Sequence, residues 1–166
     1  MVSRTRRTGL ERFTTAQNDA ESGFEAALTE IQDGRKRSHW IWYVFPQLSG
    51  LGGSQMSQVF GIDGASEAED YLRHPVLSGR LLTITTAVAE GVTRGVPLVT
   101  LMGSRTDVLK LVSSLTLFAH VARQQQEAPP DARHHAIAEA AGFVLNAAES
   151  EGYPRCAYTL ERLASG

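Results

Sequence analysis

The chain has 166 residues, a length typical of a single domain that folds without disulfide bonds or bound metals. Its formal net charge of −2 argues against a dedicated DNA-coating protein, which would be strongly basic, but is compatible with a local basic patch. The single cysteine, Cys156, excludes an intramolecular disulfide bond, and no apolar run is long enough to predict a membrane helix.

The N-terminal residues 1–9 contain three arginines, but the apolar stretch of a signal peptide does not follow them. We therefore predict a flexible basic tail over residues 1–9, a single helical domain over residues 10–166 and a cytoplasmic location. Residues 123–133, rich in glutamine and proline, predict a mobile loop that is too short to separate two domains.

The first predicted helix covers residues 22–34. Ser22, with Glu25 three positions later, forms a capping-box pattern, and Gly34 is a typical C-terminal stop. Apolar residues recur between them at intervals of three and four, as on one face of a helix. This stripe consists of Phe24, Ala27, Leu28 and Ile31.

Three strong helices are predicted further along the chain. Pro75 has the position of a first-turn proline, and Asp131 is a helix-start signal. Weaker patterns predict short helices over residues 66–73 and 157–163. The apolar stripes of the strong helices are Leu77, Leu81, Ile84 and Val88; Val108, Leu111, Val112, Leu115 and Phe118; and Ile137, Ala140, Ala141, Val144, Leu145 and Ala148.

One short segment has the character of a strand. Residues 98–102 are mostly apolar and lie between Pro97 and Gly103. An isolated strand cannot build a sheet, however, and no alternation or hairpin pattern elsewhere supplies a partner. We therefore predict an all-α, compact multihelical fold with short loops and little or no strand.

Residues 34–54, GRKRSHWIWYVFPQLSGLGGS, differ in composition from the rest of the chain. Three cations at 35–37 precede Ser38, which is a natural helix N-cap residue. An aromatic and apolar run then extends to Pro46, and it contains both tryptophans of the chain. Because a helix that is apolar on all sides must be buried, we expect this run at the centre of the core, followed by a tight glycine-rich path.

Two interpretations of this segment are open. In the first, guanidinium groups beside aromatic faces, together with helix N-terminal N–H groups, bind an anionic, nucleotide-like ligand. In the second, the cations lie favourably at the C-terminal end of the preceding helix, and the aromatic residues are core. His39 is either a functional group or a hydrogen-bonded structural histidine.

The segment resembles the signature of the uncharacterised family catalogued as domain of unknown function 1810. Residues 55–62 (QMSQVFGI), 69–77 (EDYLRHPVL) and 107–118 (DVLKLVSSLTLF) fit the same pattern, and the resemblance extends over roughly residues 10–163. It implies a multihelical, all-α fold in bacterial and some fungal proteins, but it implies no reaction. Some members carry the automatic label calpastatin, which has no weight here because calpastatin is a disordered inhibitor.

The family pattern includes polar residues that a core would not need. Asp107, Lys110, Ser113 and Ser114 lie at helical spacing opposite an apolar stripe. We therefore expect five polar residues to converge on one cleft: Arg35, Arg37, His39, Lys110 and Ser114. Alternatively, Asp107 caps its helix and the two serines ease close helix packing. The candidate ligand-binding residues are Arg35, Arg37, His39, Trp40, Lys110 and Ser114.

Motifs of defined chemistry are missing. The stretch 50–54 lacks the lysine of a phosphate loop, and glutamine stands at the third glycine of a dinucleotide fingerprint. His134, His135 and Glu139 make only a weak metal pattern, so we predict neither a metal nor a cofactor. No motif places a histidine beside Cys156, which we interpret as a bystander thiol.

Three functions compete at this stage. The first is a small-molecule binding protein or enzyme for a phosphorylated or nucleotide-like ligand, with no catalytic residue that can be named. The second is a non-enzymatic helical protein-interaction module, which predicts an exposed apolar patch instead of a cleft. The third, nucleic-acid binding, is disfavoured by the net charge. We rank the first narrowly ahead, and a monomer and a weak dimer both fit the sequence.

Overall fold

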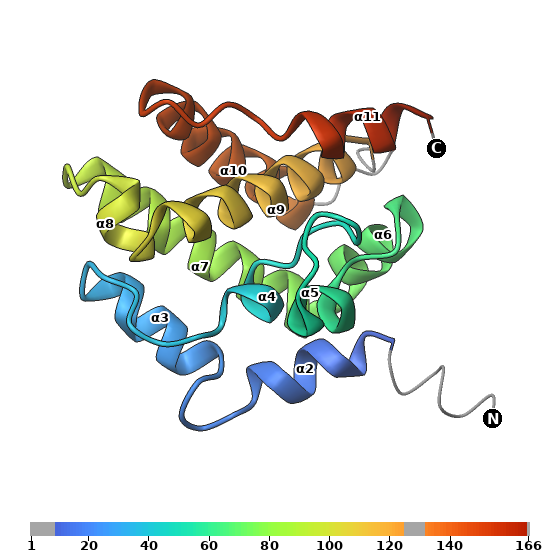
Figure 1. The fold of residues 1–166 in the computed structure, drawn as a ribbon, viewed down its shortest axis with the longest axis horizontal. Coiled ribbons are helices and arrows are strands. Elements are labelled where there is room, and N and C mark those ends of the chain that lie inside the picture. The colour runs from blue at the N-terminus through green and yellow to red at the C-terminus, as the bar shows by residue number, and fades with distance from the viewer. Residues whose placement is uncertain (1–8, 125–131, 166) are drawn as a thin grey trace.

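Ten helices make up the part of the chain that this computed structural model describes, residues 9–124 and 132–165 (Figure 1). Within these residues the only β pairing is an isolated bridge between Leu48 and Ile62. The predicted all-α fold is therefore confirmed. The helices are α2 (Glu11–Gln17), α3 (Phe24–Gln32), α4 (Ile41–Val44), α5 (Gln55–Phe60), α6 (Ala65–Arg73), α7 (Pro75–Thr93), α8 (Leu98–Met102), α9 (Arg105–Gln124), α10 (Ala132–Ser150) and α11 (Ala157–Ser165).

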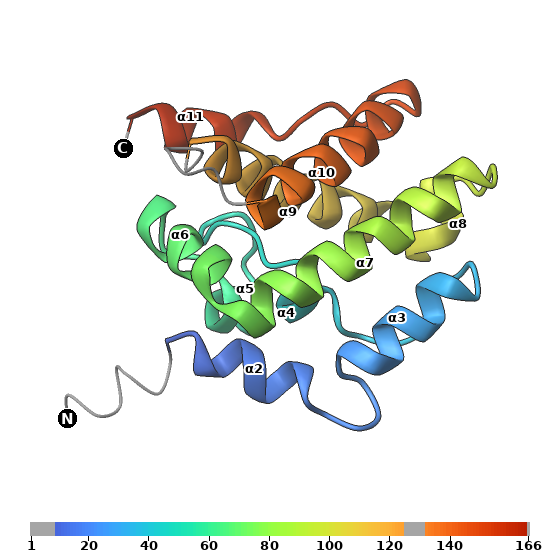
Figure 2. The same ribbon diagram turned by 180° about the vertical axis from the view of Figure 1, so that it is seen from behind.

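Three long helices form the centre of the molecule. α10 packs against both α7 and α9, and α6 also contacts these last two helices. Figures 1 and 2 show α2 and α3 on one side of this centre and α11 on the opposite side. The short α4 and α5 lie between, and α4 contacts both α2 and α9. The fold thus packs the short α4 against the N-terminal helix α2 and against the long helix α9.

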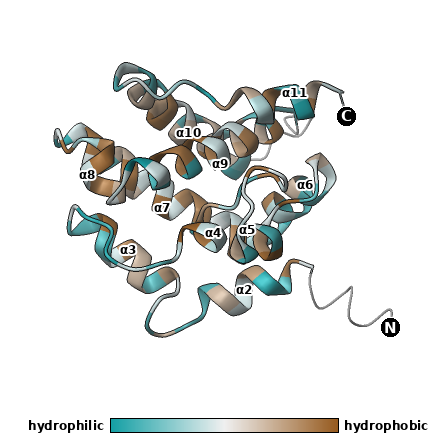
Figure 3. Cartoon of the chain, in the orientation of Figure 1, coloured by the Kyte–Doolittle hydropathy of each residue, from teal (hydrophilic) through white to brown (hydrophobic). Residues whose placement is uncertain are grey.

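A single cluster of buried apolar residues joins these helices. The ring of Tyr71 on α6 lies 5.3 Å from that of Phe13 on α2 and 4.9 Å from that of Phe118 on α9, measured between centroids. Figure 3 shows apolar stretches beside polar ones along the longer helices, as expected of helices that bury one face. Among the described residues, no helix has the length and apolar character needed to cross a membrane.

The strand-like segment at residues 98–102 is a helix, α8. Leu98, Leu101 and Met102 are its buried residues, and their spacing of three and four places them on one helical face. The backbone N–H groups of Thr100 and Leu101 both donate to the carbonyl of Pro97, which closes the first turn. A short apolar run cannot by itself distinguish a strand from a buried helix, and here the helix forms.

Two predicted caps are wrong. Gly23, not Ser22, is the N-cap of α3, and the backbone N–H of Ser22 instead donates to the Asp19 carboxylate at 2.9 Å. Ser38 caps no helix, because its hydroxyl donates to Glu30 at 2.6 Å and the aromatic run contains only the four-residue α4.

Other sequence signals hold. Pro75 is the first residue of α7, and α3 ends two residues before Gly34. Residues 1–8 of the predicted tail, residues 125–131 of the predicted loop and the start signal at Asp131 lie outside the described residues.

Candidate functional site

Glu30 holds residues 37–40 in place through hydrogen bonds. Its carboxylate, on α3, accepts four hydrogen bonds: from the backbone N–H of Arg37 at 2.7 Å, from the backbone N–H and hydroxyl of Ser38 at 2.9 and 2.6 Å, and from the indole Nε1 of Trp40 at 2.9 Å. Burial acts to raise the pKa of this carboxyl, but the hydrogen bonds outweigh it and hold the pKa at about 2. Glu30 is therefore charged at neutral pH and fixes the backbone of residues 37–38. We call this arrangement the Glu30 clamp.

Lys36 ties the same segment to α9. Its side chain is buried, and its Nζ lies 2.8 Å from Asp107 Oδ2 and donates to the carbonyl of Ser38 at 2.6 Å. The ammonium also lies 4.9 Å from the centroid of the Trp40 ring. The backbone N–H of Lys36 donates to the carbonyl of Leu101 on α8 at 2.8 Å. These contacts give Lys36 of the basic segment a structural role.

The remaining candidates from this segment do not line a cleft with Lys110. Arg35, Arg37 and His39 are exposed, and Arg37 lies 3.6 Å from Asp33 in a solvent-facing ion pair. Trp40 is fully buried, with its indole N–H committed to Glu30. The structure therefore does not bring the sequence-predicted residues together around one ligand.

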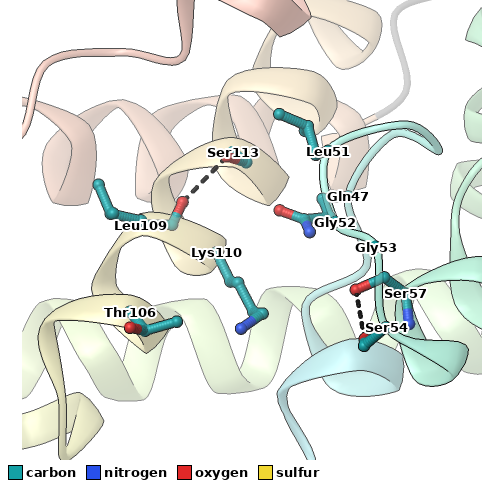
Figure 4. A pocket seen from close by; sticks show the side chains of 10 residues that line it. All are labelled: Gln47, Leu51, Gly52, Gly53, Ser54, Ser57, Thr106, Leu109, Lys110 and Ser113. Carbon is teal, nitrogen blue, oxygen red and sulfur yellow. Dashed lines mark hydrogen bonds between the residues drawn. The ribbon is translucent and has the colours of Figure 1, made fainter.

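Lys110 instead lies in a pocket of about 400 Å³, formed where α9 faces the glycine-rich loop. In Figure 4 its side chain extends from α9 into the space facing the loop and the start of α5. We call this the Lys110 pocket. It is lined by Gln47, Leu51, Gly52, Gly53, Ser54, Ser57, Thr106, Leu109, Lys110 and Ser113.

The lining of the pocket carries a positive charge. Among the described residues that line it, Lys110 alone is charged. Its nearest acidic group, Asp107 Oδ1, lies 3.9 Å away, beyond hydrogen-bond distance, while Oδ2 of the same carboxylate is bound to Lys36 at 2.8 Å. The Asp107 carboxylate is thus the ion-pair partner of both lysines of the chain. Its single negative charge neutralises only one of their two positive charges.

Polar groups surround the ammonium. The Ser54 hydroxyl donates to the Ser57 hydroxyl at 2.9 Å. It also accepts from the Ser57 backbone N–H, and Ser54 thereby caps α5. The Ser113 hydroxyl donates to the carbonyl of Leu109 and also contacts the Cys156 side chain. The loop itself is anchored, because the Tyr158 hydroxyl of α11 donates to the carbonyl of Ser49 at 3.0 Å.

Ser114 does not line the pocket. It is fully buried on α9, and its hydroxyl has no hydrogen-bond partner among the described residues. Its neighbour Ser113 faces the pocket instead, because successive helical residues point about 100° apart.

The sequence matches the family described as "Protein of unknown function (DUF1810)" over residues 7–133. The chain belongs to the DUF1810 family. A solved structure of the conserved hypothetical protein Rv1873 from Mycobacterium tuberculosis is similar to this DUF1810 protein, with 34% sequence identity and a TM-score of 0.73. The similarity covers 93% of this chain and 96% of that one. No curated protein matches the chain.

The DUF1810 match includes both the Glu30 clamp and the Lys110 pocket, although sequence reasoning found only part of each. Glu30 was missed because it lies on an otherwise amphipathic helix and no pattern marks a buried carboxylate. The hydroxyls of Ser54, Ser57 and Thr106 were missed as well. The glycine-rich loop, which predicts a close backbone approach, could have located Ser54 and Ser57, whereas no comparable signal marks Thr106 on α9.

No group of three or more histidine, cysteine or acidic side chains suited to a metal ion occurs in the part of this DUF1810 protein that the structure describes. His135 Nε2 and Glu139 Oε1 lie 3.7 Å apart on the exposed face of α10. This is an ordinary surface pair at helical spacing.

Proposed function

We propose that this protein binds a small anionic molecule, of the phosphorylated or nucleotide-like class, in the Lys110 pocket. The observation that carries the proposal is the half-buried Lys110 ammonium, which makes no hydrogen bond to any described residue and faces a polar hollow of about 400 Å³. Lysine binds phosphate groups as a compact point charge, and partial burial strengthens that attraction.

The rest of the lining supports this ligand class. Hydroxyl groups of Ser57 and Thr106 can donate to phosphate oxygens, and the glycines at 52–53 let a ligand approach the backbone closely. Leu51 and Leu109 add apolar walls for the remainder of the molecule. A pocket of this volume is of ordinary size for a small metabolite.

The alternative, a helical protein-interaction module, has less support. The large apolar side chains with high exposure come from six different helices, so no single helix presents an apolar face. They are Val59, Val76, Val99, Leu109, Phe143 and Leu160. A cytoplasmic location belongs to the same proposal, and the single cysteine is consistent with it.

The test is a thermal-shift screen of inorganic phosphate, nucleoside phosphates and sugar phosphates. A ligand at a hundred times its Kd stabilises the folded protein by about 2.7 kcal/mol, and we expect Lys110→Gln to abolish that shift. Arg35→Gln is the matched control, because it removes an exposed cation outside the pocket.

Amine acetylation gives an independent readout. The chain has two lysines and Lys36 is buried, so we expect acetylation at Lys110, read by peptide mass spectrometry, to slow when a ligand is bound. Binding that survives Lys110→Gln but is lost in Arg35→Gln or His39→Ala would move the site to the exposed face of the 35–39 segment. A silent panel with no protection of Lys110 would reject the proposal.

A further inference from the structure

A narrow slot opens beside the Lys110 pocket. Gln47, Ser57 and Lys110 line both spaces, so the slot and the pocket are neighbours. Its inner walls are aromatic. The slot has a volume of about 10 Å³, which is room for roughly one water-sized group. The other residues that line it are Trp42, Phe45, Phe60 and Gly61.

The indole of Trp42 carries an unfilled donor. Its Nε1 is buried and has no hydrogen-bond partner among the described residues. An indole N–H can only donate, and buried donors without a partner are uncommon. Trp40, two residues earlier, shows the ordinary arrangement, with its Nε1 donating to Glu30 at 2.9 Å.

A positive charge also lies beside the slot. Lys110 Nζ lies 5.8 Å from the centroid of the Trp42 ring and lines the slot, so the ammonium would attract an acceptor placed there. A single oxygen atom with a negative partial charge matches the size, the donor and the sign of the charge.

We propose that the slot receives one terminal oxygen of the ligand's phosphate group, which accepts a hydrogen bond from Trp42 Nε1. This inference rests on the proposed function and narrows it. A tetrahedral terminal phosphate directs one oxygen into the slot while its other oxygens face Lys110 and the Ser57 hydroxyl in the larger pocket. A planar carboxylate has only two oxygens, so with one in the slot it can face either Lys110 or the Ser57 hydroxyl, but not both. The ligand class is therefore a terminal phosphate, inorganic or on a small molecule.

The experiment is NMR of the full chain labelled with ¹⁵N at tryptophan. Only two indole N–H signals are expected, because the chain has two tryptophans, and Trp42→Phe assigns them. Titration with inorganic phosphate, and separately with AMP, should move the Trp42 signal downfield with saturation. The Trp40 signal, held by Glu30, is the internal control and should stay in place. Chloride at equal ionic strength and acetate should move neither signal.

Affinity gives the second readout. Trp42→Phe keeps an aromatic ring beside Lys110 but removes the donor, so phosphate should bind about tenfold more weakly, the usual effect of one hydrogen bond to a charged group. An unchanged Trp40 signal shows that the variant is folded. The wild-type titration needs no variant, so the proposal remains testable if Trp42→Phe fails to fold.

The outcomes separate the two proposals. If phosphate or AMP protects Lys110 from acetylation while the Trp42 signal stays in place and Trp42→Phe binds equally well, the oxygen slot is rejected and the proposed function stands. If neither compound protects Lys110 or moves either signal, and the wider phosphate panel is silent, both proposals are rejected.

Discussion

At the scale of single residues, Glu30 makes the largest number of specific contacts for one side chain in the 30–40 region. Its four hydrogen bonds hold two backbone N–H groups, a hydroxyl and an indole. We expect Glu30→Gln to lower the free energy of unfolding by about 2–4 kcal/mol, because a neutral amide accepts fewer and weaker bonds and brings an unwanted N–H donor. Denaturant unfolding measures the loss. Glu25→Gln, an exposed change on the same helix, is the matched control and should cost less than about 0.5 kcal/mol.

The same carboxylate makes stability depend on pH. The pKa of Glu30 is about 2 in the folded protein against an ordinary value of 4.5, so its contribution is complete above 4.5 and is lost as the pH falls towards 2. The pKa of Glu67 is also lowered, because its bonds from Arg12 outweigh burial. Wild-type stability should therefore fall between pH 5 and 3, and the fall should be smaller in Glu30→Gln. Equal slopes for the two proteins would contradict this role of Glu30.

At the scale of elements, the contact between α8 and the 35–38 segment depends on a glycine. Gly103 ends α8 with a φ of +85°, and a Cβ there would lie 3.0 Å from the carbonyl oxygen of Lys36. Gly95 has a similar φ of +89° but open space around it. Gly95→Ala should cost about 1 kcal/mol for the left-handed backbone alone, and Gly103→Ala about 2–3 kcal/mol because the clash adds to it.

Thermal and denaturant unfolding of the two variants measure this difference directly. The pair isolates the contact, since both substitutions carry the same backbone penalty. Equal losses would show that the Lys36 backbone moves away without cost, and would contradict a tightly held joint between α8 and the 35–38 segment.

The three consecutive cations show what the sequence can and cannot predict at this scale. Residues 35–37 form no helix, and their side chains alternate between exposed and buried. Lys36 therefore points inward to Asp107, while Arg35 and Arg37 point to solvent. Whether Lys36 or the two arginines are buried depends on where Glu30 and Asp107 lie. These two acidic residues belong to separate helices, α3 and α9. Periodicity predicted the long helices well, because the apolar stripe of each helix can be recognised from its own residues alone.

The aromatic run illustrates the same limit. Its burial was predicted correctly, but its helix is only four residues long, because Glu30 binds the backbone N–H groups of residues 37 and 38 just before it. Lys110 was identified from helical spacing alone, whereas the opposite wall of its pocket comes from residues 47–57, a stretch with a loop whose path no periodicity describes.

At the scale of the whole molecule, the core does not end where the family match ends. The match stops at residue 133, just inside α10, yet α10 packs against both central partners, α7 and α9. The similarity to Rv1873, in contrast, covers 93% of the chain. The buried residues of α10 are His134, Ile137, Ala138, Ala141, Gly142, Val144, Leu145 and Ala148.

Two truncations test whether α10 belongs to the folding unit. A chain of residues 1–133 loses this whole set and exposes the matching faces of α7 and α9. Because each large apolar side chain contributes roughly 1.5–3 kcal/mol and a domain has only about 5–15 kcal/mol in total, the fragment should show no cooperative unfolding. A chain of residues 1–152 loses α11, whose only buried residue is Thr159, and should still unfold cooperatively at a lower temperature. Circular dichroism during heating distinguishes them. A sharp transition in the shorter chain would mean that α7 and α9 form a stable core without α10, and that the family match marks the true folding unit.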